Sequence, residues 1–316
     1  MKFHWNMKTT FLPVESPSAT KDGFTFIELL VMLVVVALLA VTLLPALANT
    51  PPGSRAFQCL NNQRQIMLAL RMYAEDNNDL FPPNEYPYIT PFSTATATAQ
   101  NTMRNWAVGT MLATVDSANG SILTNRYSVL SPYINTPASY RCPADTYIDP
   151  ATHKVHARSY SMNSAVGTMW YSSTAFGGFG QIGAPVAGGW LGGNSYTTVN
   201  VPWFTYGKFS SIIRPTPANL FVIIEENPYS INDSSIAISA SASSGDGYLI
   251  DWPAANHDQA ATIAFADGHS IVHKWLSPDT YSPQTFVAPG QGSQGSRLER
   301  NNQDLSYLAG ITSAHR

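Results

Sequence analysis

The residues best suited to metal or acid–base chemistry lie in one stretch, HDQAATIAFADGHSIVHKW, at residues 257–275. Two imidazoles and one carboxylate, from His257, Asp267 and His269, form a ligand set that an open zinc site can use. Turn chemistry alone also explains Asp267, because Asp-Gly pairs favour tight hairpin turns. We therefore predict no catalytic residue, no metal and no cofactor, and keep the zinc site as the alternative.

The sequence contains two cysteines, Cys59 and Cys142. Their separation fits neither a redox Cys-x-x-Cys motif nor the ligand spacing of a common zinc site. If the domain lies outside the cytoplasm, an oxidising environment favours one disulfide between them. The sequence leaves two buried free thiols open as the other interpretation.

Signatures of enzymes are otherwise absent from the sequence. It has no nucleophile elbow, no HExxH motif and no phosphate-binding loop. Charged residues make up 12% of the chain, and no cluster of lysine and arginine is present. These features predict a protein that is not an enzyme and does not bind nucleic acid.

Glu28 stands out by its surroundings, because it is the only charged residue between Phe24 and Leu47. A helix rises about 1.5 Å per residue, so residues 24–48 are long enough to cross a hydrocarbon core of about 30 Å. Lysines precede this stretch, and the positive-inside rule then places the N-terminus in the cytoplasm. We predict a single-pass inner-membrane protein whose C-terminal domain is periplasmic or extracellular.

The stretch KDGFTFIE, residues 21–28, resembles the class III signal of type IV pilins and type II secretion pseudopilins. The resemblance implies that a prepilin peptidase cuts between Gly23 and Phe24, removing residues 1–23, and that Phe24 is then N-methylated. It also implies that Glu28 pairs with the N-terminal amine of a neighbouring subunit. A simple single-pass anchor is the alternative.

Apolar residues of CLNNQRQIMLALRMYAEDNN recur at helical spacing, which predicts an amphipathic helix ending near Asn77. Residues 49–80 would continue the spine begun by residues 24–48, with a bend or break at residues 51–53. In the pilin resemblance, Pro45 matches the proline that kinks the family's helix. The expected fold class is α+β, with a long N-terminal transmembrane and spine helix followed by an exported, pilin-like domain.

The exported domain, residues 81–285, is expected to be built on an antiparallel β-sheet. NLFVIIEE, residues 219–226, is a β-branched and aromatic run between prolines, which indicates a buried strand. The Asp-Gly pair within residues 257–275 indicates a hairpin with a two-residue turn, which pairs Ile263 with Val272.

A segment rich in glycine and aromatic residues spans residues 167–207. Exposed aromatic rings are typical of binding surfaces, so one interpretation is an adhesive or polysaccharide-binding surface. The interpretation that we favour is a long insertion whose aromatic rings pack onto the sheet. Residues 286–316 are expected to form a loop-rich tail.

His257, nine intervening residues and then Asp267-Gly268 match the H-X9-DG signature of prepilin-like proteins of the DUF1559 family. The segments CLNNQRQIMLALRMYAEDNN, RCPAD and FADGH are similar to landmarks of that family and occur in the same order. No biochemical activity is established for that family, so this resemblance implies an architecture more than a chemistry.

Together these features predict a structural, pseudopilin-like subunit of a type II secretion-like or type IV pilus-like assembly. Its expected partners are the prepilin peptidase/N-methyltransferase, other pilin or pseudopilin subunits, and the membrane. The alternative is a membrane-tethered extracytoplasmic module that binds polysaccharide or mediates adhesion and uses the signal only as an anchor.

Overall fold

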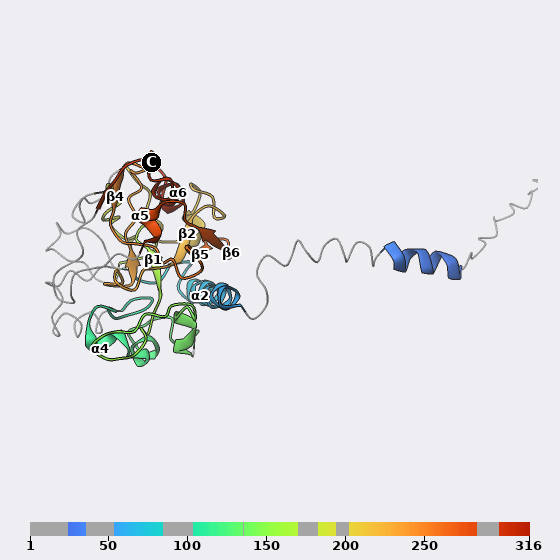
Figure 1. Ribbon diagram of the computed structural model, residues 1–316, viewed down its shortest axis with the longest axis horizontal. Coiled ribbons are helices and arrows are strands. Elements are labelled where there is room, and N and C mark those ends of the chain that lie inside the picture. Colours follow the sequence, from blue (N-terminus) through green and yellow to red (C-terminus); the bar gives the residue numbers. More distant parts are fainter. Residues whose placement is uncertain are drawn as a thin grey trace, which may run out of the picture. The chain divides into compact units, whose positions relative to one another are not determined.

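The computed structural model forms two compact units, Met1–Thr50 and Pro51–Arg316 (Figure 1). The described residues are 25–35, 54–84, 104–134, 136–169, 183–193, 202–282 and 297–316. The leader, Gly23, Phe24 and Pro45 therefore lie outside the described residues. Within the described ranges, no helix is both long enough and apolar enough to cross a bilayer.

In the first unit, residues 26–35 form an α-helix that starts with a capping box. The Glu28 carboxylate accepts hydrogen bonds from the backbone N–H and the hydroxyl of Thr25, both at 2.8 Å. In return, the Thr25 hydroxyl accepts from the Glu28 N–H at 3.3 Å. Two donors at the start of the helix are thereby satisfied. Glu28 thus has a local partner within its own chain.

The second unit begins with helix α2, Arg55–Asp76. The Ser54 hydroxyl caps its start by accepting from Phe57 N–H at 3.1 Å. The helix ends at Asn77, whose N–H bonds to the carbonyl of Ala74, and the next two residues have positive φ. The amphipathic helix predicted to end near Asn77 is therefore confirmed.

A five-stranded sheet forms the centre of this unit, in the order β3-β1-β2-β5-β6. All neighbouring pairs are antiparallel except β1 and β3, which run parallel. The α+β class is therefore confirmed, and the sheet is mostly rather than wholly antiparallel. The strands are β1 Tyr160–Asn163, β2 Phe221–Glu225, β3 Ser235–Ile236, β5 Ala260–Phe265 and β6 Ser270–Lys274.

Helices cover both faces of this sheet, and the alternation of residues along β5 shows how. Ala264 belongs to the same core cluster as Ile66 and Leu70 of α2, whereas Ile263 belongs to a second cluster with Leu308. Leu308 lies on α6, Gln303–Thr312. Because successive strand residues point to opposite faces, β5 is buried along its whole length. This explains why its sequence is almost entirely apolar.

The β5–β6 hairpin differs by one residue from the predicted register. Thr262 pairs with Val272 and Ile263 with Ile271, so the expected pairing of Ile263 with Val272 is wrong. The Gly268 N–H bonds to the carbonyl of Phe265, and Gly268 has a φ of 98°. These features make a three-residue loop with glycine in the left-handed position.

The remaining described elements surround the sheet. Within the stretch expected to be a loop-rich tail, residues 297–316 form β7 and α6, and β7 pairs with β4. Most aromatic residues of the segment 167–207 lie outside the described residues, and of those described, Tyr206 is buried and Phe204 is exposed. Both interpretations of this segment therefore stay predictions. These remaining elements are β4 Gly247–Leu249, β7 Arg297–Glu299, α4 Thr114–Ser117, α5 Pro278–Tyr281, η1 Gly120–Thr124, η2 Pro137–Tyr140 and η4 Phe209–Ser211.

Candidate functional site

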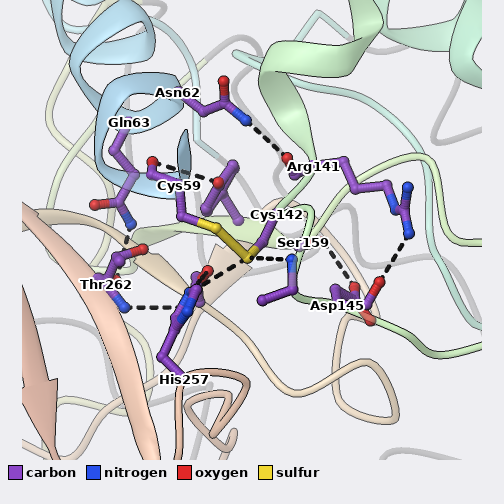
Figure 2. Close-up of a disulfide and its surroundings, with 12 residues drawn as sticks. Cys59, Asn62, Gln63, Arg141, Cys142, Asp145, Ser159, His257 and Thr262 are labelled. Atoms are coloured by element: carbon purple, nitrogen blue, oxygen red, sulfur yellow. Dashed lines mark hydrogen bonds and ion pairs between the residues drawn. A yellow bond between two sulfur atoms is a disulfide. The ribbon is translucent and has the colours of Figure 1, made fainter. Parts of the chain in front are cut away.

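The two cysteines form a disulfide that joins α2 to the segment after η2 (Figure 2). Cys59 and Cys142 are 83 residues apart in sequence, and their Cα atoms are 5.1 Å apart. Both side chains are fully buried. The disulfide interpretation is therefore confirmed. Such a bond persists in oxidising compartments, so it indicates an extracytoplasmic domain.

His257 lies directly against the disulfide (Figure 2). Its Nε2 atom is 3.4 Å from Cys142 Sγ and 3.0 Å from Glu225 Oε1. Glu225 is the last residue of β2 and is fully buried, and its Oε2 accepts from Thr262 N–H at 2.8 Å. The buried carboxylate is thus held by an imidazole on one oxygen and by a backbone N–H of β5 on the other.

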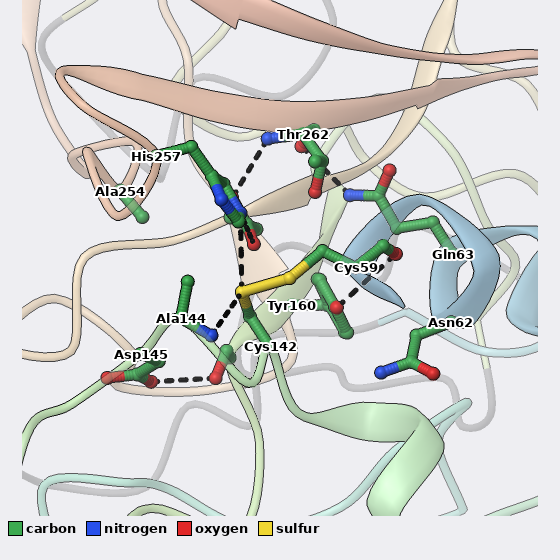
Figure 3. A network of polar contacts seen from close by, with 12 residues as sticks. Cys59, Asn62, Gln63, Cys142, Ala144, Asp145, Tyr160, Ala254, His257 and Thr262 are labelled. Carbon is green, nitrogen blue, oxygen red and sulfur yellow. Dashed lines mark hydrogen bonds and ion pairs between the residues drawn. A yellow bond between two sulfur atoms is a disulfide. The ribbon is translucent and has the colours of Figure 1, made fainter. Parts of the chain in front are cut away.

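Further hydrogen bonds link this group to the surrounding elements (Figure 3). The Ala144 N–H donates to Cys142 Sγ at 3.3 Å, and the Gln63 side chain of α2 donates to the Thr262 carbonyl at 2.8 Å. The Tyr160 hydroxyl of β1 reaches the Cys59 carbonyl at 3.5 Å. We call Cys59, Cys142, Glu225 and His257 the disulfide cluster. In its oxidised state the cluster joins α2 to the segment after η2, and His257 links that segment to Glu225 of β2.

The chemistry available to this cluster follows from its geometry. Both the carboxylate and the sulfur contact the same ring nitrogen of His257, Nε2. A relay of the nucleophile–imidazole–carboxylate type needs its two partners on opposite ring nitrogens. The cluster therefore does not have the geometry of a catalytic triad.

The other members of the H-X9-DG motif lie away from this cluster, at the far end of β5. Asp267 Oδ1 is 2.6 Å from His269 Nδ1 and also accepts from the His269 N–H, so both residues belong to an exposed turn. His257 precedes β5, whose six residues span about 20 Å. The zinc site built from His257, Asp267 and His269 therefore does not form. The nine residues between His257 and Asp267 therefore include the whole of the buried strand β5.

A second buried polar group, which no local sequence pattern indicates, contains Arg158, Glu226, Asp233 and Asp251. The Arg158 guanidinium donates to four oxygens, those of the Tyr160, Gly109 and Asp233 carbonyls and the Ser161 hydroxyl, at 2.6–3.1 Å. Burial raises the pKa of Asp233 to about 6 and lowers that of Arg158 to about 10. Burial, and then mutual repulsion with Asp251, raises the pKa of Glu226 well above its usual range.

A surface groove with a volume of about 330 Å³ lies over the residues that flank both cysteines. On one side it is bounded by the start of α2, including Phe57 and Asn62, and on the other by Arg141 and Pro143. Asn62 links the two sides by donating to the Arg141 carbonyl at 2.9 Å. Neither cysteine lines the groove, and both remain fully buried.

Comparison with known proteins identified one family. No curated protein and no solved structure matched the chain. A family model described as "Protein of unknown function (DUF1559)" matches residues 52–214, just over half of the chain. The match includes α2 and both cysteines and ends before the H-X9-DG motif. The chain belongs to the DUF1559 family.

Proposed function

We propose that this chain is a non-catalytic, pseudopilin-like subunit of a type II secretion-like or type IV pilus-like assembly. A prepilin peptidase would process its N-terminus, and the apolar helix that follows would anchor it in the inner membrane. The observation that carries the proposal is the stretch KDGFTFIE at residues 21–28, directly before an apolar run of span length. The disulfide of the second unit supports export.

The helix over residues 26–35 supports this role, because its apolar side chains are exposed on all sides. Transfer of one such side chain from water to an apolar environment contributes about 1.5–3 kcal/mol. A helix that is apolar all round is stable only in lipid or against other helices. The exposed apolar residues are Phe26, Ile27, Leu29, Leu30, Val31, Met32, Leu33, Val34 and Val35.

Glu28 would have two roles at different stages. In the single chain its carboxylate completes the capping box with Thr25. In an assembly it would pair with the amine that cleavage creates on a neighbouring subunit's Phe24. An ammonium and a carboxylate inside an apolar helix bundle offset each other's desolvation, whereas a lone carboxylate does not.

Processing gives the first test of this proposal. In cells with prepilin peptidase, we expect the membrane-extracted protein to begin at N-methylated Phe24, because the leader ends at Gly23. Intact mass and N-terminal peptide analysis measure this directly. Cells without the peptidase are the control and should yield a chain that retains residues 1–23. A chain cut after the apolar run would contradict the proposal.

Assembly gives the second test. We expect Glu28→Ala to be inserted and cleaved normally, but to reduce the yield of filaments or crosslinked complexes about tenfold or more. The loss follows because the amine of the neighbouring subunit has no carboxylate partner. The yield of assembled protein relative to wild type is the measurement.

Two matched variants separate the two roles of Glu28. Glutamine at the third helical position can still complete a capping box, so Glu28→Gln removes the charge and keeps the cap. We expect this variant to assemble as poorly as Glu28→Ala. Thr25→Ala removes the cap and keeps the charge, and it should assemble nearly normally. Wild-type yield from Glu28→Gln would show that the residue acts only as a cap.

A further inference from the structure

We propose that the disulfide cluster binds one zinc ion when its two cysteines are reduced. The ligand atoms of Cys59, Cys142, Glu225 and His257 all lie within 4.8 Å of one another. Two thiolates, one imidazole and one carboxylate are a ligand set that zinc accepts in tetrahedral sites. This inference does not depend on the proposed function.

The distances within the cluster suit a metal. Zinc binds sulfur at about 2.3 Å and nitrogen or oxygen at about 2.0–2.2 Å, so neighbouring ligands in a tetrahedral site lie roughly 3.3–3.8 Å apart. His257 Nε2 lies 3.0 Å from Glu225 Oε1 and 3.4 Å from Cys142 Sγ. Small side-chain adjustments after the S–S bond is broken would therefore complete the site.

Surrounding hydrogen bonds already orient two of the four ligands. The Thr262 N–H holds Glu225 Oε2, which leaves Oε1 directed at the imidazole. The Ala144 N–H donates to Cys142 Sγ, a contact that stabilises a thiolate. Outer hydrogen bonds of this kind fix ligands and increase metal affinity.

Burial favours the metal over the free thiolates. Cys59, Cys142 and Glu225 are each fully buried, and the His257 side chain is 6% exposed. Thiolates beside the Glu225 carboxylate would be strongly destabilised there without a cation, so the metal-free reduced cysteines would stay neutral thiols. A zinc ion carries two positive charges and so compensates most of this negative charge.

The reaction balances with a dithiol as the reductant. The dithiol transfers two electrons and two protons to the S–S bond and becomes a disulfide itself, while Cys59 and Cys142 become thiols. Zinc binding then releases the two thiol protons and forms two zinc–sulfur bonds. The oxidised and metal-bound states exclude each other. The first joins α2 to the segment after η2, and the second would join both to Glu225 of β2.

A metal titration of the full-length chain in detergent micelles tests the proposal. A phosphine reductant is suitable, because it takes oxygen from water to form a phosphine oxide and adds no competing thiol. We expect the reduced chain to bind one zinc ion at micromolar metal, and the oxidised chain to bind none at this site. Cobalt(II) is the spectroscopic probe, since a thiolate-to-cobalt absorption band appears only when a cysteine sulfur is bonded directly to the metal.

His257→Ala is the matched variant, and His269→Ala, in the exposed turn, is its control. We expect the first to weaken zinc binding about 100-fold and the second to leave it unchanged. If reduction unfolds the chain, near-ultraviolet circular dichroism follows the same titration, and zinc should restore the folded signal. Absence of cobalt–thiolate absorption, no recovery of the fold, or equal affinity of His257→Ala and wild type would each overturn the proposal.

Discussion

Replacing both cysteines by alanine, Cys59→Ala with Cys142→Ala, is expected to lower the free energy of unfolding by about 4 kcal/mol. The disulfide closes a loop of 83 residues, and a loop of this size strongly restricts the unfolded chain. The bond also holds α2 against the segment that follows η2. Urea denaturation with a tryptophan fluorescence readout measures the loss as a lower midpoint.

Three controls assign this loss to the covalent bond. Wild type reduced by a phosphine in metal-free buffer should lose a similar amount, because it lacks only the S–S bond. The serine pair, Cys59→Ser with Cys142→Ser, should lose more, since it buries two hydroxyls beside His257. A loss below about 1 kcal/mol in both the alanine pair and reduced wild type would show that packing alone holds α2.

Arg158→Met is expected to lower the free energy of unfolding by about 3–5 kcal/mol at neutral pH. Arg158 is fully buried, and its removal leaves the carbonyls of Gly109 and Asp233 without their donor. It also removes the positive charge that faces the buried carboxyl groups of Glu226 and Asp233. Methionine keeps much of the side-chain volume, so the loss reports mainly on hydrogen bonds and charge.

The size of this effect should increase with pH. The folded-state pKa of Asp233 is about 6, above its unfolded value, so protonated Asp233 stabilises the fold at low pH and this contribution is lost as pH rises through 6. Arg158 lowers that pKa, and its removal should raise it further. Above pH 6 the folded variant then binds more protons than folded wild type, and the penalty of the substitution increases.

Chemical denaturation of both proteins at pH 5 and pH 8 measures this difference. Arg64→Met is the matched control, because Arg64 lies on the exposed side of α2 and should change stability by less than about 0.5 kcal/mol at either pH. An equal penalty for Arg158→Met at both pH values would show that hydrogen bonding alone accounts for the role of Arg158.

Local sequence patterns predicted several elements correctly, because local physics governs them. The helical spacing of apolar residues before Asn77 corresponds to α2, and the β-branched run at residues 219–226 contains β2. The sequence leaves open whether Cys59 and Cys142 form a disulfide or remain free thiols. Thiol oxidation depends on the compartment and on the distance between the two side chains, and the sequence spacing shows neither.

The hairpin register shows where a local pattern was insufficient. An Asp-Gly pair favours a two-residue turn, yet backbone N–H groups of Ala266 and Asp267 bond to the carbonyls of Leu220 and Pro217. Arg71 of α2 also donates to the Ala266 carbonyl at 2.7 Å. These contacts with distant segments extend the loop to three residues and shift the pairing by one.

The sequence by itself determined the apolar N-terminal run, the principal helix and strands, and the motifs typical of the DUF1559 family, because periodicity and turn chemistry act over a few residues. Only the tertiary structure decided that His257 meets Glu225 and the disulfide, while Asp267 lies at the other end of β5. It also decided that Arg158 is buried among carboxyl groups. Neither group leaves a local signal, because its members come from separate segments whose meeting depends on how the whole sheet and its covering helices pack.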